Sequence, residues 1–553
     1  MRLRQAIFAA LPALTLAGAA QAKDDLVIGA AQFPSTLNPF IDPEVIKTYA
    51  LGFTQRTISA FDKDWRPVCM LCAELPSLEN GLAVLEDRPD GKKGMRITIK
   101  LKPGLMWGDG KPVTAQDLAF THKIALDPNS GFSNTYPWNR ASRVEVVDAT
   151  TAVLHTDKVI VDYMMWDQVL PEHLEGPAYA KAAQPGEYIK TTLYAREPTN
   201  PGLWNGPYII TQYQSGAQVV FEPNPHWNGP KPGLKRIVLR TVENTAALQA
   251  NLLAGDVDLV AGEGVGLTID QALALRKTSP DRFDYEFRPS LTYEHIDLNL
   301  GNPLLADVRV RRALLLATDR QTLVTRLFEG LQPVAATWVN PLHPMYDPGI
   351  KPAPFDLPGA KKLLADAGWT PGPDGICRNA AGVRLSLEIT TTAGNRLREL
   401  TQQVLQNQWK AACVEVAIKN EPARTLFGQT LKRREYTGMG MYGWSSTASE
   451  SPRRTLGTSD IPTATNNYGG ANYPGFSNPE VDENIAKVES ELDPAKAKQD
   501  WSTMQRIYAE QVPVLPLFFR AEPHIVPKWL SGYQPLGNGY TAGIFAEQWA
   551  PRP

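Results

Sequence analysis

The chain has 553 residues, of which 43% are hydrophobic, and it carries 56 Lys and Arg side chains against 58 Asp and Glu. This near balance of charge excludes a basic nucleic-acid-binding surface and a polybasic membrane-binding segment. A chain of this length exceeds the size at which one hydrophobic core stops growing, and its 46 Pro and 42 Gly residues indicate many turns, so we expect two or three compact lobes.

The N-terminal 22 residues have the pattern of a secretory signal peptide. Arg2 and Arg4 precede an apolar run over residues 6–20, and residues 20–22 form a small-x-small cleavage site. A membrane anchor is the alternative, but the run is short for a span and no second apolar segment follows. No Cys lies near the site, which excludes lipid attachment there. We expect cleavage after Ala22 and a soluble mature protein outside the cytoplasm.

The mature chain begins with a predicted buried strand over residues 26–32, and a loop over residues 33–39 turns out of it. Backbone groups in a loop at the end of a strand are free to pair with a ligand. Gln32 and Phe33 are therefore candidate ligand-binding residues, with an ordinary turn as the alternative.

Cys69 and Cys72 form a C-x-x-C motif, which in a redox enzyme would be the reactive pair. A reactive pair needs an acidic thiol at a helix N-terminus, and the flanking residues 65–68 and 73–76 do not have that context. A zinc site would need a second pair of ligands, and none lies nearby in the sequence. In an oxidising compartment we favour a structural disulfide.

Residues 96–123 predict an alternating strand, a Gly-Asp-Gly turn and a helix capped by Thr114, with Asp117 three residues on. Within this segment, residues 107–120 resemble the W-x-D-G-x-P-x-T-A-x-D-x-x-F signature of the family 5 extracellular solute-binding proteins. These are the dipeptide, oligopeptide and nickel binders of ABC importers. Four later segments resemble the family's motifs in the same order along the chain: residues 224–232, 247–258, 298–319 and 360–369.

The third of these segments belongs to the most characteristic part of the chain. Residues 293–299 alternate like a strand and lead into two helices, the first capped by Asp307 and the second restarting at Asp319. The helical spacing predicts two buried faces, which consist of Val310, Ala313, Leu314 and Ala317 and of Leu323, Val324, Leu327 and Phe328. Gly330 stands where a left-handed residue ends a helix. We interpret this element as a crossing between two lobes.

The resemblance implies an α/β fold with two lobes that close on a ligand, a class II periplasmic binding protein of the cluster C type with an extra subdomain in the first lobe. The expected division is a signal peptide at 1–22, a first lobe at 23–64, 195–289 and 515–553, its extra subdomain at 65–194, and a second lobe at 290–514. The resemblance also implies a periplasmic monomer that delivers its solute to an inner-membrane ABC permease, with no cofactor and no nucleic-acid partner.

Cys377 and Cys413 flank a predicted strand at 383–390 and a predicted helix at 395–412, and Cys413 opens a second strand at 414–418. If the two strands are parallel neighbours, the two cysteines come together. Closing that loop with a disulfide would stabilise the fold by roughly 3 to 4 kcal/mol. The sequence leaves the connectivity of the four cysteines open.

Residues 438–447 predict an alternating, glycine-rich strand. An extended ligand could pair with its backbone while Tyr442 and Trp444 form walls of side-chain pockets. Trp338 and Tyr293 are further candidates for ligand walls. Packing of these rings in the core of a lobe is the alternative.

The same strand departs from the pattern of dipeptide-binding relatives, which resembles G-W-T-G-D-x-G-D-P and in which the first Asp pairs with the α-amino group of the ligand. Here Ser445 and Thr447 follow the tryptophan, and Thr447 stands about where the Asp should be. Glu450 is the only carboxylate nearby. A buried ammonium without a counter-charge is costly, so this departure argues against a peptide with a free amino terminus.

Arg396 and Arg398, in the first turns of a predicted helix, lie near where relatives place an Arg that binds the ligand carboxylate in a bidentate manner. A solvated helix face is the alternative. Asn466 and Tyr468 lie in a Gly-rich loop that could close over the cleft, and their amide and phenol groups would suit a neutral polar ligand.

These observations lead to an importer-associated binding protein for a peptide or peptide-like solute. The alternative ligand is an oligosaccharide, an opine-like conjugate or another polar metabolite. A secreted hydrolase is a remote alternative, because H-E-x-x-H and G-x-S-x-G are absent and the seven His are scattered. A chaperone or sensor partner on the same fold is a third class, for which the sequence offers no discriminating feature. We therefore expect no enzyme activity. With no His cluster and only separated cysteines we expect no direct metal site, and a metal chelated by an organic ligand stays open.

Overall fold

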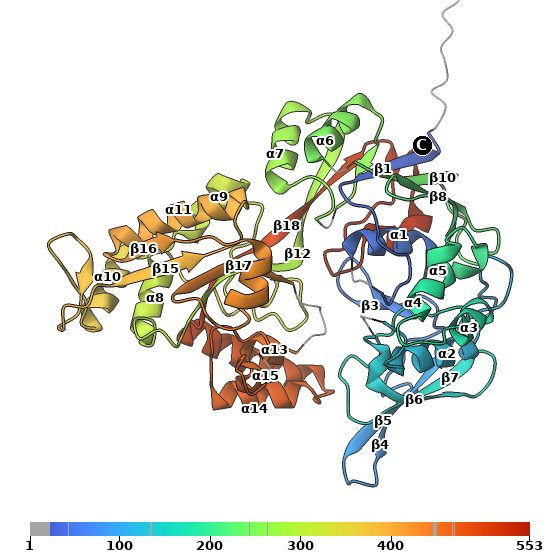
Figure 1. Cartoon of the computed structure of the whole chain (residues 1–553), viewed down its shortest axis with the longest axis horizontal. Coiled ribbons are helices and arrows are strands. Elements are labelled where there is room, and N and C mark those ends of the chain that lie inside the picture. Colours follow the sequence, from blue (N-terminus) through green and yellow to red (C-terminus); the bar gives the residue numbers. More distant parts are fainter. Residues whose placement is uncertain are drawn as a thin grey trace, which may run out of the picture.

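A sheet of ten strands runs through both lobes of the protein, in the order β16-β15-β17-β12-β18-β11-β1-β10-β9-β8 (Figure 1). The computed structural model describes residues 23–41, 44–132, 135–242, 244–262, 264–445, 451–466, 468 and 470–553. The predicted signal peptide, Thr447 and Glu450 therefore lie outside the described residues. Within the described part of the chain, every helix is too short or too polar to cross a membrane.

The first lobe carries the end of the sheet that contains β1, which pairs in parallel with β10 and β11. Its elements are β1 (Asp25–Ala30), α1 (Val45–Thr54), η2 (Pro201–Leu203), β8 (Tyr208–Gln214), β9 (Gln218–Pro223), β10 (Arg236–Thr241), α6 (Thr245–Ala254), β11 (Leu259–Val260), α7 (Ile269–Thr278), β19 (Leu530–Ser531), η5 (Ala542–Gln548) and β20 (Ala550–Pro551). Every second residue of β1, from Leu26 through Ile28 to Ala30, is fully buried. The first core thus follows from the two-residue period of the strand.

The segment predicted as an extra subdomain has its own sheet of four strands, in the order β4-β5-β7-β6. Its elements are β2 (Ser59–Phe61), β3 (Pro67–Cys69), β4 (Ala83–Asp87), β5 (Lys93–Lys100), α2 (Ala115–Leu126), η1 (Trp138–Arg140), β6 (Ala141–Val146), β7 (Thr151–Thr156), α3 (Glu172–Ala180), α4 (Tyr188–Thr191) and α5 (Leu193–Arg196). The predicted capping box at the start of α2 is confirmed, with Thr114 and Asp117 satisfying each other's backbone N–H groups. The hydrophobic core of this subdomain is continuous with that of the first lobe.

The second lobe contains the other end of the large sheet and most of the longer helices. Its elements are α8 (Val308–Leu316), α9 (Arg320–Phe328), α10 (Leu357–Asp366), β13 (Thr370–Pro371), β14 (Cys377–Arg378), β15 (Ser386–Thr390), α11 (Arg396–Ala411), β16 (Glu415–Ile418), α12 (Ala423–Thr425), η3 (Leu426–Thr430), β17 (Met439–Ser445), α13 (Arg453–Leu456), η4 (Thr458–Asp460), α14 (Pro479–Val488) and α15 (Pro494–Gln511). It has a separate core, in which the sheet packs against α8, α9 and α11.

The predicted pair of helices is confirmed as α8 and α9. The Asp307 carboxylate accepts a hydrogen bond from the Arg309 N–H, and the Asp319 carboxylate accepts one from the Thr322 N–H. Both predicted faces point into the second core, with only Leu327 partly exposed. The left-handed end of α9 begins one residue earlier than predicted, because Glu329 (φ 54°) adopts this conformation together with Gly330 (φ 76°).

The two lobes are connected through β12 (Phe283–Leu298) and β18 (Val514–Pro527), which pair antiparallel over almost their whole length (Figure 1). In the first lobe, residues 283–289 pair with residues 521–527, and Ile525 also pairs with Val260 of β11. In the second lobe, residues 292–298 pair with residues 439–445 of β17. The register of the two long strands shifts between Pro289 and Tyr293. Pro289 has no N–H to give to the ladder, so the irregularity lies where a proline is tolerated.

We propose that the lobes divide along these strands. The first crossing then lies at residues 290–292, at the predicted boundary. Leu515, Leu517 and Phe518 belong to the second core, so the return crossing lies a few residues beyond the predicted boundary at 514/515. The other predicted boundaries of the first lobe and its subdomain are kept in this proposal.

Two disulfide bonds are present, Cys69–Cys72 and Cys377–Cys413. Cys377 and Cys413 meet because β15 and β16 are parallel neighbours, as expected, and the Cys377 N–H also donates to the Cys413 carbonyl at 2.8 Å. Cys69 ends the short strand β3 and Cys72 follows in the loop, so this C-x-x-C is not at a helix N-terminus. The context that a reactive pair needs is therefore absent at this motif.

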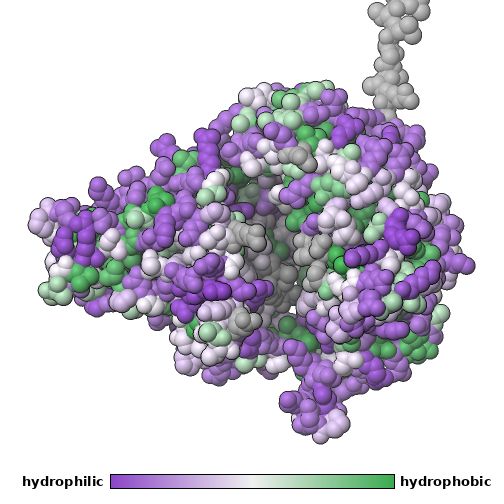
Figure 2. Space-filling model, viewed as in Figure 1, coloured by the Kyte–Doolittle hydropathy of each residue, from purple (hydrophilic) through white to green (hydrophobic). Residues whose placement is uncertain are grey.

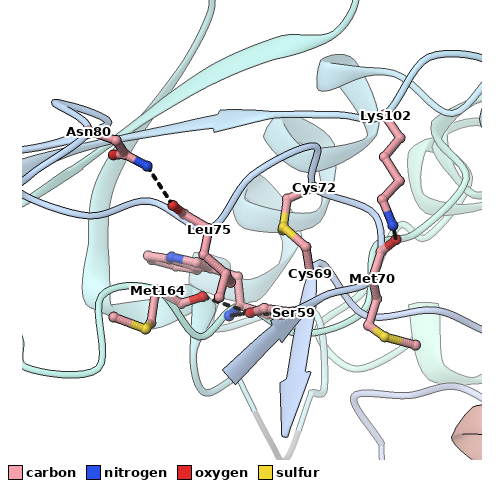
Figure 3. The surroundings of a disulfide bond; sticks show 9 residues. Ser59, Cys69, Met70, Cys72, Leu75, Asn80, Lys102 and Met164 are labelled. Atoms are coloured by element: carbon pink, nitrogen blue, oxygen red, sulfur yellow. Dashed lines mark hydrogen bonds between the residues drawn. A yellow bond between two sulfur atoms is a disulfide. The ribbon is translucent and has the colours of Figure 1, made fainter. Parts of the chain in front are cut away.

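The Cys69–Cys72 bond holds together a region where several segments of the first lobe meet (Figure 3). The Ser59 hydroxyl of β2 donates to the Met164 carbonyl at 2.7 Å. On the other side, the Lys102 ammonium donates to the Met70 carbonyl at 2.9 Å. The disulfide thus fixes the loop that ties the β2–β3 pair to residues 161–166 and to the end of β5.

We predict that the two disulfides differ in their contribution to stability. In the chain-entropy model the loss on opening a disulfide grows with the loop it closes, and the sequence separations are 36 for Cys377–Cys413 and 3 for Cys69–Cys72. The double Ser variant of the first pair should lose roughly 3 to 4 kcal/mol of unfolding free energy and that of the second roughly 2 kcal/mol. Urea denaturation with and without reductant measures both, and equal losses would contradict the entropic explanation.

Candidate functional site

A pocket rich in aromatic side chains lies in the second lobe, and we call it the aromatic pocket. Its principal lining residues are Tyr293, His295, Asp297, Trp338, His343, Tyr442, Trp444, Trp501 and Tyr508. It encloses about 850 Å³, including the part that is open to solvent. All of its lining residues lie between residues 291 and 514, so the second lobe builds it alone. Four of the predicted ligand walls, Tyr293, Trp338, Tyr442 and Trp444, meet here.

The period of the strands explains one wall of this pocket. Tyr293, His295 and Asp297 alternate along β12, so their side chains leave the sheet on the same face. Directly opposite on β17, Trp444 pairs with Tyr293 and Tyr442 pairs with His295. The His295 ring lies 4.9 Å from the Tyr293 ring and 4.4 Å from the Tyr442 ring, measured between centroids. Cross-strand pairs of this kind stabilise the sheet while they form a continuous aromatic surface.

The opposite wall comes from α15 and from the segment that follows α9. Trp501 and Tyr508 are two turns apart on α15 and face the same way. The Trp338 ring lies 5.0 Å from Tyr508 and 6.2 Å from Trp501. The hydroxyls of Tyr508 and Tyr293 are hydrogen-bonded at 2.9 Å, which joins the two walls.

The aromatic pocket has one buried carboxylate, that of Asp297, which is 2% exposed. The Tyr442 hydroxyl donates a hydrogen bond to its Oδ2 at 2.5 Å, and the His295 Nε2 lies 3.4 Å from its Oδ1. Burial and then the Asp297 charge raise the pKa of Tyr442 well above its ordinary value. The phenol therefore keeps its proton and acts as a fixed hydrogen-bond donor to Asp297.

The aromatic pocket adjoins the space between the lobes. A neighbouring pocket shares His343, Ser451 and Trp501 with it and is also lined by Phe61 and Met164 of the first lobe and its subdomain. Figure 2 shows the molecule hollowed between the two lobes. The aromatic pocket therefore borders a space that residues of both lobes line.

A second pocket lies on the other face of the sheet, and we call it the arginine pocket. Both lobes line it. The first lobe contributes residues 264 and 266–270, and the second lobe and the crossing strands contribute Glu294, Gln332, Asn395, Arg396, Arg398 and Arg520. The N-termini of α7 and α11 both contribute to its wall, and helix N-termini favour negative charge. The predicted candidates Arg396 and Arg398 are thus placed on the face of the sheet opposite to Tyr442.

Glu294 is the central charge of the arginine pocket. Its side chain is 5% exposed and forms ion pairs with Arg398 of α11, at 2.9 Å, and with Arg520 of β18. Burial by itself would raise the pKa of Glu294, but Arg520 and Arg398 outweigh this effect and hold the pKa below its ordinary value. The ion pairs therefore tie together α11 and both strands of the crossing.

The remaining predicted residues line neither of these two pockets. The Phe33 ring packs against Tyr213 in the first lobe, with the centroids 5.4 Å apart, and the Gln32 carbonyl accepts from the Thr241 hydroxyl at 3.3 Å. Ser445 ends β17, where its hydroxyl is bonded to that of Thr292 at 2.9 Å.

Asn466 and Tyr468 lie in their predicted loop, where each has a local contact. The Asn466 side chain accepts from the Thr463 N–H at 2.9 Å and donates to the Ile461 carbonyl at 2.9 Å. The Arg433 guanidinium lies 5.4 Å from the centre of the Tyr468 ring. A role in ligand binding remains a prediction for these residues and for Gln32, Phe33 and Ser445.

Several residues of the two pockets were not predicted. His295 and Asp297 follow from the alternation that starts at Tyr293, since every second residue of a strand shares a face. Trp501 and Tyr508 follow in the same way from their spacing of seven on a predicted helix. Glu294 and Arg520 are 226 residues apart and carry no local signal of their contact. Among the described residues, no group of three or more His, Cys, Asp and Glu could hold a metal ion.

Comparison with known proteins agrees with this architecture. The model of the bacterial extracellular solute-binding proteins, family 5 (middle region), matches residues 83–467. The chain is 24% identical over 535 residues to the oligopeptide-binding protein AppA of Bacillus subtilis (strain 168), a match that covers 94% of this chain and 90% of AppA. It is 22% identical over 480 residues to the periplasmic oligopeptide-binding protein OppA of Escherichia coli (strain K12), covering 82% and 83% of the two chains.

Among solved structures, the oligopeptide-binding protein from Thermus thermophilus complexed with a pentapeptide is similar over 96% of both chains. The sequence identity is 31% and the TM-score is 0.71. The likeness therefore includes both lobes and the crossing strands between them.

We predict that Glu294→Gln destabilises the protein by about 3 kcal/mol near neutral pH. Removing one partner of a buried ion pair leaves the other charges uncompensated, and Arg520, at 37% exposed, is partly relieved by solvent. Urea unfolding at pH 7 measures the loss. Glu145→Gln, which removes an exposed ion pair with Arg143, is the control and should change stability by less than about 1 kcal/mol.

The same variant has an expected pH dependence. Because the folded-state pKa of Glu294 is lowered, its carboxylate contributes stability that is fully present above the unfolded-state pKa of Glu, about 4.3, and is lost as the pH falls through the folded-state pKa. The difference in unfolding free energy between wild type and Glu294→Gln should therefore shrink between pH 6 and pH 3. A difference that stays constant over this range would contradict the assigned charge state.

Proposed function

Because the chain belongs to the bacterial extracellular solute-binding proteins of family 5, we propose that it captures a peptide or peptide-like solute between its two lobes for an ABC importer. The observation that carries this proposal is the position of β17 between the aromatic pocket and the arginine pocket. The relatives named above are oligopeptide-binding proteins, and the one in the solved structure holds a pentapeptide.

One edge of β17 is open to an extended ligand. β15 pairs with β17 only at Met439 and Gly440, whereas β12 pairs with it as far as Ser445. Among the described residues, no strand pairs with the second edge of residues 442–445. A peptide that adds to this edge gains backbone hydrogen bonds that do not depend on its sequence.

Strand addition would also distribute the side chains of the ligand. Successive side chains of an added strand point to opposite faces of the sheet. One set would enter the aromatic pocket beside Tyr442 and Trp444, and the other would enter the arginine pocket. Arg396, which is exposed and lies in the first turn of α11, is the residue that we assign to a ligand carboxylate.

The same proposal includes export and transport. Residues 1–22 would act as a signal peptide cleaved after Ala22 without lipid attachment, and the mature monomer would work in the periplasm with an inner-membrane permease. We propose binding without catalysis, cofactor or metal. Thr447, at the position of the amino-terminal Asp in dipeptide binders, supports a ligand whose amino group is bound elsewhere or is absent.

A neutral polar ligand, such as an oligosaccharide or an opine-like conjugate, is the second candidate. Flat aromatic walls accept the apolar face of a sugar ring as well as a peptide side chain. The absence of a carboxylate at Thr447 favours this candidate over a free dipeptide.

A thermal-shift screen of residues 23–553 tests the proposed ligand class, because a ligand that binds only the folded state raises the melting midpoint by mass action. Di- to pentapeptides should raise the midpoint by several degrees. A shift with oligosaccharides or amino-blocked conjugates alone would overturn the peptide assignment and leave a binding protein for polar metabolites.

We further predict that Trp444→Ala weakens binding of the best peptide by about tenfold to a hundredfold, since an aromatic side chain at a ligand contact is commonly worth about 1 to 3 kcal/mol. Isothermal titration calorimetry measures the change. Phe355→Ala, in the same lobe but 48% exposed and outside the three pockets described above, is the matched control and should bind as the wild type does. Equal affinity for both variants would remove Trp444 from the site.

A further inference from the structure

The buried Asp297 carboxylate of the aromatic pocket has few polar partners. Among the described residues, His295 is the only basic side chain with a nitrogen within 4.0 Å of the Asp297 carboxylate. In the part of the chain that the structure describes, the other polar contact of this carboxylate is the neutral Tyr442 hydroxyl. A buried carboxylate without a full counter-charge is costly to the folded protein.

His295 contacts the Asp297 carboxylate through one ring nitrogen only. Its Nδ1 lies 3.0 Å from the Tyr293 carbonyl, which can only accept, so Nδ1 carries a proton. The second ring nitrogen, Nε2, faces the Asp297 Oδ1 at 3.4 Å, a longer contact than the one that Tyr442 makes. A carboxylate has about four lone-pair sites, so Asp297 keeps capacity for a further donor.

The walls around Asp297 suit a cation. The rings of Trp338, Trp501 and Tyr508 stand opposite those of Tyr293 and Tyr442, as described above. The negative faces of such rings attract ammonium and guanidinium groups, and most strongly where water is excluded. Arg454, which also lines the pocket, lies over the Trp444 ring, 5.4 Å from its centre, and forms no ion pair with Asp297.

We propose that the aromatic pocket is a subsite for a ligand group that ends in an ammonium or guanidinium, held by Asp297 and the surrounding aromatic rings. This inference rests on the proposed function and names the ligand class more closely, a peptide or conjugate with a basic side chain or amine. It also gives the ligand's positive charge a partner in a protein that has Thr447 instead of the amino-terminal Asp.

The test compares two tripeptides that differ only in the terminal ammonium, Ala-Lys-Ala and Ala-norleucine-Ala, by isothermal titration calorimetry with residues 23–553. The wild type should bind the lysine peptide at least about tenfold more tightly than the norleucine peptide. Asp297→Asn should abolish this preference by weakening the lysine peptide, with little effect on the norleucine peptide.

Two further variants keep the test specific. Tyr442→Phe removes the hydroxyl donor but keeps the Asp297 charge, so the preference for lysine should persist. Asp284→Asn changes an exposed Asp on the same strand in the first lobe, and it should bind both peptides as the wild type does. Circular dichroism melting checks that each variant is folded.

The outcomes separate this inference from the proposed function. Equal binding of the two peptides by the wild type, or a preference that survives in Asp297→Asn, overturns the cation subsite and leaves the peptide-binding function intact. If neither tripeptide binds but agmatine, a small guanidinium amine, raises the melting midpoint only when Asp297 is present, the subsite stands and the peptide assignment falls. If agmatine also fails, both are overturned.

Discussion

The antiparallel pairing of β12 with β18 is the constraint on which the rest of the structure depends. These two strands belong to both lobes, so one hydrogen-bonded ladder sets the geometry of the whole ten-stranded sheet. Each lobe adds its own core to one half of the ladder. Because the strands are antiparallel neighbours, the chain can leave the first lobe along β12 and return along β18. The two crossings therefore lie side by side, although they are more than 200 residues apart in the sequence.

The period of β12 then divides the chemistry between the two faces of the sheet. Tyr293 and Asp297 point to the aromatic pocket, whereas Glu294, between them, points to the arginine pocket. Gly443, opposite Glu294 on β17, makes this arrangement possible. A Cβ there would lie 3.0 Å from the Glu294 Oε1 and 3.3 Å from the Arg398 Nη2. The missing side chain leaves room for the buried ion pairs of Glu294.

The sequence alone could not predict this role of Gly443, because it depends on contacts with residues that are distant in the chain. Patterns within about twenty residues were sufficient for the helix pair α8 and α9 and for the capping box of α2, because caps and periodicity act locally. The proximity of Cys377 and Cys413, 36 residues apart, also required the parallel pairing of β15 with β16. The ordered motifs added the family and the two lobes. The glycines of residues 438–447 were interpreted as exposed backbone, whereas Gly438 and Gly440 pack closely against Glu388 and Leu431.

The candidate site was predictable to a smaller extent, for a physical reason. Tyr442 and Trp444 were predicted because the alternation of residues along a strand indicates which side chains share a face. The contact of Glu294 with Arg520 depends on the pairing of strands that are distant in the chain, which no local pattern encodes. The separation of Arg398 from Tyr442 by a sheet likewise depends on which face α11 covers. The Glu294–Arg520 contact and the placement of Arg398 both depend on the pairing of β12 with β18. That pairing forms only when both lobes are assembled.

The position of the aromatic pocket next to the crossing gives it a mechanical consequence. Leu291 lines the pocket and lies in the segment between Pro289 and Tyr293, where the register of β12 and β18 shifts. Such unpaired residues absorb the changes in φ and ψ when two lobes rotate. The Asn340 amide, which also lines the pocket, donates to the Ser290 carbonyl at 2.7 Å and so holds the same segment from the second lobe. In the binding mode proposed above, a ligand group in the pocket would contact this segment, and any difference in its affinity for open and closed arrangements of the lobes would shift their populations.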